Sequence, residues 1–217
     1  VIGTAPVAAT GCEGSTVSYS VSASGSGLTY VWEEDNGGGF AVIVNGGVYS
    51  GAASATLTLT GITSAMNGYD YRVTVANGAP SVCVASLTSG GVNLTVEEVP
   101  EITLQPVAST ICENTNTTFT VNAGVTTVPA YQWQESTNGG SSYSNVVNGG
   151  IYSGATLGTL TLTGVPLGSN GYLYRVIVSG TCAPSVVSNG AVLNVEQNVV
   201  IGTAPVAATG CEGSTVS

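Results

Sequence analysis

The segment TLTLTG occupies residues 56–61, and it returns letter for letter at residues 159–164. Threonine and leucine alternate through it, which is the period of a β-strand that buries one face and exposes the other. The same alternation marks Thr16–Val21 and Thr117–Val121, and glycine-rich turns such as residues 36–39 separate the runs. No stretch carries a helical period, so the sequence predicts an all-β chain.

Two repeats of different length organise the chain. The segment VIGTAPVAATGCEGSTVS at residues 1–18 returns unchanged at residues 200–217, which indicates a window cut from a tandem array. A shorter, degenerate repeat lies inside it and matches YSGA at residues 49–52 with YSGA at residues 152–155. We therefore expect related domains at 1–98 and 99–197, followed by the first strands of the next repeat at 198–217.

Composition limits the classes of partner and reaction. A net charge of −10 with only two basic residues argues against binding to nucleic acid or to an anionic membrane surface. No apolar run reaches the roughly 18 residues of a membrane helix, so we expect this segment not to be embedded in a membrane. Histidine is absent and both basic residues are arginines. Ser–His–Asp and Cys–His catalysis therefore cannot be assembled, and we expect no enzyme.

Acidic residues gather at the first domain boundary. Glu97, Glu98 and Glu101 lie where cadherin-like arrays hold calcium, a cation that prefers carboxylate oxygens. The second boundary offers only Glu196, so a calcium mechanism shared by both junctions is not expected, and a solvated acidic linker is favoured. With no histidine and no CxxC pair, zinc is not expected either. We assign no metal and no cofactor.

Three further groups of side chains have a structural and a functional interpretation. Arg72 is expected to pair across strands with Glu33, with anion binding as the alternative. The outward threonines of the two TLTLTG segments are expected to form a solvated β-surface, with ice or glycan binding as the alternative. Tyr49 and Tyr152 are expected to plug the edges of their domains rather than to serve as stacking platforms for sugars.

The combined pattern resembles the immunoglobulin superfamily. Glu13–Val21 looks like the turn into strand B and the strand itself, and Trp32 looks like the core tryptophan of strand C. Tyr69–Tyr71 looks like the tyrosine corner that opens strand F. The resemblance implies tandem immunoglobulin-like β-sandwich domains arranged end to end. The core residues that it implies are Val21, Trp32 and Tyr71 in the first domain, and Val121, Trp133 and Tyr174 in the second.

The core disulfide of that superfamily has no counterpart in this chain. Its positions would fall at Val21 and Tyr71, and at Val121 and Tyr174, and none of these is a cysteine. The resemblance therefore implies that apolar burial alone holds each core together.

Five cysteines at positions 12, 83, 112, 182 and 211 suggest a disulfide framework in an oxidising compartment. Pairing within domains would join Cys12 to Cys83 and Cys112 to Cys182. The immunoglobulin topology implies otherwise, because the A–B turn of Cys12 and the F–G turn of Cys182 lie at opposite poles, about 30 Å apart within a domain. A disulfide needs Cα atoms within about 7 Å. Cys12 is therefore expected to bond Cys182 across the junction, while Cys83, Cys112 and Cys211 bond neighbouring repeats.

A narrower resemblance is carried by YQWQ at residues 131–134, by the YSGA and TLTLTG segments, and by the GYxYR strand. These are similar to the immunoglobulin-like repeats of very large cell-surface proteins of Bacteroidetes, of the gliding-motility adhesin type. The resemblance implies an extracellular or cell-surface stalk or filament that serves cell adhesion.

Two alternatives to the stalk remain open. One is a binding module with low affinity for surface glycans or polymers, which gains avidity from copy number. The other is a filament subunit that donates a strand to its neighbour. The identical chain ends favour a continuous array, because a donated strand does not need to copy the subunit's own first strand. The expected partners are neighbouring repeats of the same chain and, for the binding module, surface glycans or polymers.

Overall fold

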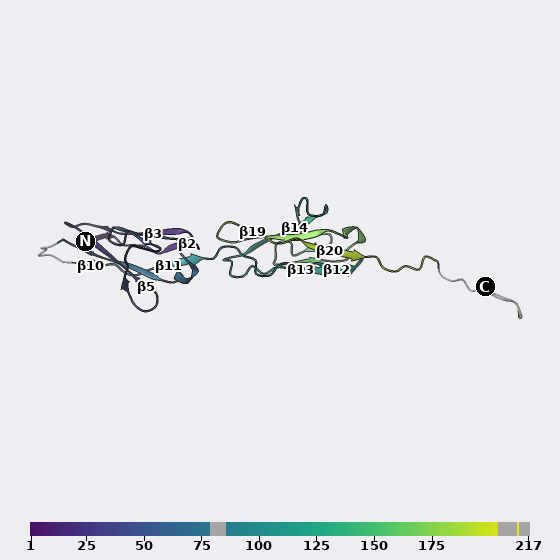
Figure 1. The fold of residues 1–217 in the computed structure, drawn as a ribbon, viewed down its shortest axis with the longest axis horizontal. Helices are drawn as coiled ribbons and strands as arrows, with labels where there is room; N and C mark the ends of the chain where they lie inside the picture. The colour runs from purple at the N-terminus through teal and green to yellow at the C-terminus, as the bar shows by residue number, and fades with distance from the viewer. Residues whose placement is uncertain (79–85, 204–211, 213–217) are drawn as a thin grey trace.

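The computed structural model describes residues 1–78, 86–203 and 212. These residues form two β-sandwiches that follow one another end to end along one axis (Figure 1). The expected first strands of the next repeat, at 198–217, lie largely outside the described residues, as do Cys83 and Cys211.

Within residues 1–78 and 86–98, the first sandwich contains eleven strands and one short 3-10 helix, η1, at Ser64–Met66. Its strands are β1 (Ile2–Thr4), β2 (Ala9–Cys12), β3 (Thr16–Ser20), β4 (Ser22–Ala23), β5 (Thr29–Asp35), β6 (Ala41–Val42), β7 (Tyr49–Ser50), β8 (Thr56–Thr60), β9 (Asp70–Ala76), β10 (Ser86–Thr88) and β11 (Val92–Glu97).

The second sandwich contains nine strands and the 3-10 helix η2 at Leu167–Ser169. Its strands are β12 (Ser109–Cys112), β13 (Thr117–Thr120), β14 (Ala130–Ser136), β15 (Ser144–Asn145), β16 (Tyr152–Ser153), β17 (Thr159–Leu162), β18 (Leu173–Ser179), β19 (Val186–Val187) and β20 (Ala191–Glu196).

Both sandwiches share one topology. In the first, the larger sheet has the order β2-β11-β9-β5-β6 with β10 also paired to β9, and the smaller sheet has the order β3-β8-β7. In the second, the orders are β12-β20-β18-β14-β15, with β19 on β18, and β13-β17-β16. The threonine–leucine segments lie in the small sheets as β8 and β17, where every leucine is buried in the core.

The beginning of the first domain changes sheets. Strand β1 pairs with β4, which follows the small-sheet strand β3, whereas β2 pairs in parallel with β11 of the large sheet. This parallel pairing sets Cys12 opposite Glu97, and in the second domain the pairing of β12 with β20 sets Cys112 opposite Glu196. Because β11 and β20 are the last strands of their domains, each of these cysteines lies at the end from which the chain leaves.

A fully buried tryptophan lies in each core. Trp32 donates its Nε1 hydrogen to the Ser54 carbonyl oxygen at 2.9 Å, and Trp133 donates to the Leu157 carbonyl oxygen at 2.8 Å. Each ring is thus removed from water without leaving its polar atom unpaired. The other core positions named from the sequence are buried as well, namely Val21, Tyr71, Val121 and Tyr174.

An aromatic pair lies beside each tryptophan. Tyr19 stacks on Tyr71 with ring centroids 4.9 Å apart, and Phe119 stacks on Tyr174 at the same separation. The immunoglobulin resemblance places Val21 opposite Tyr71, and nothing in the sequence distinguishes Tyr19 from Val21 as the partner of that ring. Tyr19 and Val21 both point inward because strand residues two apart share a face. The alternation alone therefore does not determine which of the two contacts Tyr71.

The repeated YSGA motif forms a turn that requires glycine. Gly51 has a φ of +76°, and a Cβ at this position would clash with the Thr56 carbonyl oxygen. Gly154 in the second domain has a φ of +77° and the same restriction against Thr159. The backbone conformation of this turn therefore explains why the motif recurs with its glycine intact.

Candidate functional site at the interdomain junction

A disulfide bond joins the two sandwiches. Cys12 ends β2 in the first domain, and Cys182 follows β18 in the second, with the Sγ atoms 2.06 Å apart and the Cα atoms 5.8 Å apart. The two residues are 170 positions apart in the sequence. The bond confirms the interdomain pairing predicted from the sequence and rules out the alternative of Cys12 with Cys83.

The disulfide lies at the point where the chain passes from one domain to the next. Glu13 donates its backbone N–H to the Glu97 carbonyl oxygen at 2.9 Å, which holds the turn after Cys12 against the end of β11. The Sγ atom of Cys182 lies 3.5 Å from that same carbonyl oxygen, and Cys182 is only 3% exposed. The disulfide therefore packs against the end of β11.

The linker is hydrogen-bonded to the second sandwich. Glu98 donates its backbone N–H to Thr127 Oγ1 at 2.8 Å, and Glu101 donates its own to Thr126 Oγ1 at 3.0 Å. Between these two bonds Pro100 is buried. The junction is thus held by a covalent bond and by a docked linker, which together restrict rotation of one domain against the other.

Three carboxylates, of Glu13, Glu98 and Glu101, lie at the junction. Partial desolvation, followed by the charges of Glu13 and Glu101, raises the pKa of the Glu98 carboxyl. Glu13 and Glu101 each accept a backbone N–H, from Ser64 and from Val125, both at 3.2 Å. Across the part of the chain that the structure describes, no group of three or more acidic, cysteine or histidine side chains is arranged to hold a metal ion.

The exit end of the second domain repeats the geometry of the first. Cys112 lies opposite Glu196, and Glu113 donates its backbone N–H to the Glu196 carbonyl oxygen at 2.8 Å. Cys112 itself is exposed and carries a free thiol. The expected bonds of Cys112, Cys83 and Cys211 to neighbouring repeats remain predictions.

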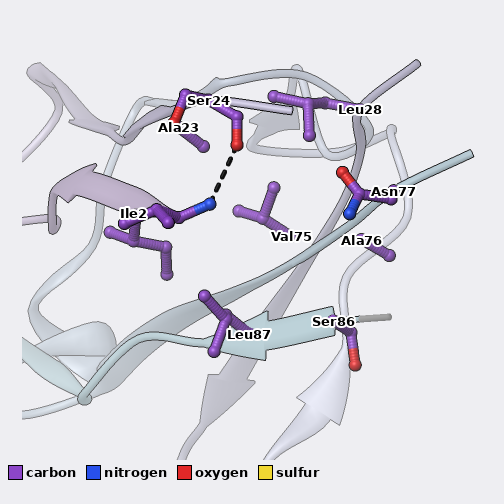
Figure 2. Close-up of a pocket in the computed structure, with 10 residues that line it drawn as sticks. Ile2, Ala23, Ser24, Leu28, Val75, Ala76, Asn77, Ser86 and Leu87 are labelled. Carbon is purple, nitrogen blue, oxygen red and sulfur yellow. Dashed lines mark hydrogen bonds between the residues drawn. The ribbon is translucent and has the colours of Figure 1, made fainter. Parts of the chain in front are cut away.

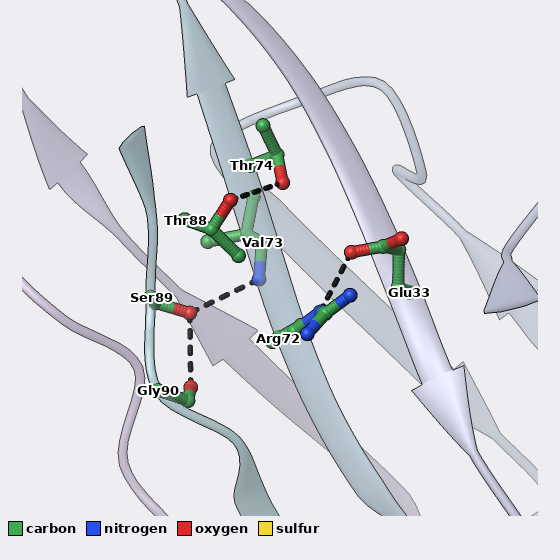
Figure 3. A network of polar contacts seen from close by, with 7 residues as sticks. All are labelled: Glu33, Arg72, Val73, Thr74, Thr88, Ser89 and Gly90. Atoms are coloured by element: carbon green, nitrogen blue, oxygen red, sulfur yellow. Dashed lines mark hydrogen bonds and ion pairs between the residues drawn. The ribbon is translucent and has the colours of Figure 1, made fainter. Parts of the chain in front are cut away.

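The arginine of the first domain lies on the outer face of the large sheet (Figure 3). Arg72 donates from Nε to Glu33 Oε2 at 2.7 Å, and its guanidinium lies 3.9 Å from the centroid of the Phe40 ring. Next to it the hydroxyls of Thr74 and Thr88 are hydrogen-bonded at 2.8 Å. The guanidinium is thus engaged by a carboxylate and a ring, which favours the structural interpretation over anion binding.

The second domain keeps this arrangement, with a neutral glutamine in the place of the glutamate. Arg175 donates from Nε to Gln134 Oε1 at 2.9 Å, and its guanidinium lies 3.7 Å from the centroid of the Tyr143 ring. Both domains therefore share the arginine–ring stack, whereas the ion pair belongs to the first domain. The stack is the common structural element at this position.

The repeated tyrosines Tyr49 and Tyr152 are half-buried, and each donates its hydroxyl hydrogen to a glutamate carboxylate. Tyr49 donates to the Glu34 carboxylate, which also accepts from Tyr71 at 3.0 Å. Tyr152 donates to Glu135 Oε2 at 2.6 Å. Burial, and then the hydrogen bond to Glu34, raises the pKa of Tyr49 to about 12. Every tryptophan, tyrosine and phenylalanine of the chain is buried or half-buried.

Within the described residues, no helix is long and apolar enough to span a membrane.

A family model described as a domain of unknown function, DUF8696, matches residues 103–197, which is most of the second sandwich. A comparison with curated proteins finds no match.

Solved structures with the same fold are numerous. The I-band fragment I67-I69 from titin is 16% identical, with 91% of this chain and 65% of that chain covered and a TM-score of 0.67. Extracellular domains 3-5 of Drosophila OTK are 16% identical, with 90% and 61% covered and a TM-score of 0.54. The complex of Dpr11 IG1 with DIP-gamma IG+IG2 is 15% identical, with 90% and 98% covered and a TM-score of 0.52.

The chain spans less than two thirds of the length of the titin and OTK fragments. At these identities the similarity shows the fold alone. The fold is that of tandem immunoglobulin-like β-sandwich domains.

Proposed function

We propose that this chain is a structural spacer, stiffened by disulfides at its domain junctions, in a tandem immunoglobulin-like array of an exported surface protein. The observation that carries the proposal is the disulfide between Cys12 and Cys182. The fold agrees with a structural or adhesion repeat, and the disulfide fits an oxidising compartment outside the cytoplasm.

The disulfide changes the path that tension takes through the chain. Tension applied at Val1 reaches Cys12 at the end of β2 and then passes through the sulfur atoms to Cys182. Residues 13–181 lie outside this covalent path. Both sandwich cores lie mostly within that bypassed segment, so unfolding a core adds little length to a stretched molecule.

A second interdomain disulfide would make every junction of the array alike. Cys112 holds the place in the second domain that Cys12 holds in the first, as the matching pairs with Glu196 and Glu97 indicate. In the sequence, Cys83 lies three positions before Ser86, as Cys182 lies three positions before Ser185. We therefore assign Cys112 to a bond with the Cys83 position of the next copy, Cys83 to the preceding copy, and Cys211 to a domain beyond residue 217.

The spacer is favoured over the two alternatives by features of both domains. A glycan-binding module needs exposed aromatic rings for stacking, whereas the aromatic side chains of this chain are buried or half-buried. A strand-donating subunit needs a sandwich that lacks a strand, whereas β2 and β12 already occupy the edges beside β11 and β20. The resemblance to gliding-motility adhesin repeats of Bacteroidetes makes a cell-surface stalk in adhesion the specific form of the proposal.

Analysis of the protein isolated from its source tests the proposal. An intact mass many times the 21.4 kDa of this chain is expected, together with crosslinked peptides that contain Cys112 and Cys83 under non-reducing conditions. An intact mass near 21.4 kDa, or a crosslink between the Cys12 and Cys83 peptides, contradicts it.

A further inference from the structure

The end of the second sandwich that faces the first is sealed by the linker. Glu98 and Glu101 donate their backbone N–H groups to Thr127 and Thr126, and Pro100 is buried between them. The Cγ atom of Pro100 lies 3.6 Å from the position that a Cβ on Gly180 would occupy. Pro100 therefore packs directly on the backbone at the end of β18.

The same end of the first sandwich is an open pocket (Figure 2). Val1 donates from its backbone nitrogen to the Ser24 carbonyl oxygen at 2.8 Å, a bond that an amide in a continuous chain can also make. The side chains around the pocket are mainly aliphatic. Those that matter here are Val1, Ile2, Leu28, Val75, Asn77 and Leu87.

Strand register makes this pocket the counterpart of the sealed end. Ala76 is the last residue of β9 and pairs with the first residue of β5, as Ser179 ends β18 and pairs with the first residue of β14. Asn77 therefore holds the place of Gly180. The pocket beside Asn77 lies where the second domain receives Pro100.

A backbone contact extends the match to the hydrogen-bonding residue. Gly78 donates its N–H to the Ser26 carbonyl oxygen at 3.2 Å, as Thr181 donates to the Thr127 carbonyl oxygen at 3.0 Å. Ser26 thus corresponds to Thr127, and both carry a hydroxyl. The acceptor that holds the Glu98 amide has an equivalent in the first domain.

The other end of the chain carries a segment that fits. Residues 197–199 follow β20 as residues 98–100 follow β11, and residues 200–217 repeat residues 1–18. Val199 is therefore the equivalent of Pro100. Its side chain is 99% exposed in this structure, although Pro100 is buried.

We propose that the pocket at the beginning of the first sandwich is the seat for the linker of another copy of this chain. Val199 of that copy occupies the position in the first domain that Pro100 occupies in the second. The backbone N–H of Gln197 donates to the Ser26 hydroxyl, as that of Glu98 donates to Thr127. Seating removes the exposed valine from water together with part of Leu87, which lines the pocket and is 41% exposed. The inference rests on the proposed function, because the occupant is the preceding repeat of the array.

A chain with two consecutive copies tests the seat by NMR, with Val199 of the first copy followed directly by Val1 of the second. Labelling one copy at a time separates the second copy's filled pocket from the first copy's open pocket, which is a matched control in the same molecule. We expect contacts between the Val199 methyl groups and Leu28 of the second copy alone. The Gly78 amide of that copy should exchange at least about fivefold more slowly than its counterpart.

Variants at Val199 decide between seating and mere proximity. Val199→Asp should abolish the contacts and the slow exchange, whereas Val199→Pro, which copies the first junction, should keep the slow exchange. Val147→Asp is the control, because Val147 is 73% exposed on the second domain. Equal exchange in both copies, or equal behaviour of Val199→Asp and Val147→Asp, overturns the seat. Neither result alters the path of tension through Cys12 and Cys182, so the proposed function fails or stands separately.

Discussion

Cys12 and Glu97 lie opposite each other in the parallel strands β2 and β11, so the cysteine sits beside the residue at which the chain leaves the first domain. Cys182 meets this pair from the second domain, with its Sγ 3.5 Å from the Glu97 carbonyl oxygen. A sheet pairing within one domain thus positions the covalent bond between two domains.

The disulfide between Cys12 and Cys182 is expected to limit bending at the junction. In Cys12→Ser/Cys182→Ser, small-angle scattering should show a broader distribution of interatomic distances than in the parent chain, because only the docked linker then restrains the domains. Cys112→Ser is the matched control, since Cys112 carries a free thiol, and it should leave the distribution unchanged. Identical scattering from the double variant and the parent would show that the linker alone sets the geometry.

Loss of a core tryptophan is expected to be severe. Trp32→Ala should lower the free energy of unfolding of the first domain by about 3–5 kcal/mol, because it empties a fully buried site with no covalent bond inside that core. Val42→Ala, at a side chain that is 62% exposed, should change it by less than about 0.5 kcal/mol. Denaturant unfolding measures both, with the second domain as an internal reference. A loss below about 1 kcal/mol for Trp32→Ala would refute the central placement of this ring.

The stacked rings of Tyr19 and Tyr71 should be energetically coupled. A double-mutant cycle with Tyr19→Leu and Tyr71→Leu is expected to give a coupling free energy of about 0.5–1.5 kcal/mol, the range for aromatic pairs. The cycle of Val21→Ala with Tyr71→Leu should give a smaller value. If the Val21 cycle gives the larger coupling, the valine rather than Tyr19 is the main partner of Tyr71.

Alkaline pH should destabilise the first domain through Tyr49. Its pKa is raised from 10.0 to about 12, so the unfolded chain loses the proton at lower pH than the folded one. The stabilisation is fully present below pH 10 and is lost as the pH rises through about 12. Unfolding measured from pH 8 to pH 11.5 should therefore show a declining free energy of unfolding. Tyr49→Phe should show a shallower decline, and an unchanged slope in that variant would exclude Tyr49 as a contributor.

Several parts of this structure could be predicted from the sequence because they depend on period and spacing. The alternation in TLTLTG predicts half-buried strands, and the topology implied by Trp32 and Tyr71 separates the poles of a domain, which leaves Cys12 and Cys182 to meet across the junction. Tyr19 could not be identified as the partner of Tyr71, because a period-two pattern does not distinguish one inward-facing residue of a strand from another.

The docking of the linker could not be predicted for a different reason. Thr126 and Thr127 receive the linker amides, but threonine is abundant throughout the chain and nothing in its local pattern marks these two. Their role follows only from the three-dimensional meeting of the linker with the loop before β14. The partner of Cys112 depends on a further copy of the repeat, and no pattern within one copy contains it.

Single-molecule stretching of the 217-residue chain from its two ends tests the central claim most directly. Under oxidising conditions the disulfide keeps a segment about 170 residues long out of the covalent path. Complete unfolding should therefore release roughly 600 Å less length than in reducing conditions, at about 3.5 Å per residue. Cys12→Ser/Cys182→Ser should extend like the reduced chain whatever the redox conditions. An oxidised parent chain that extends as far as this double variant would contradict the account.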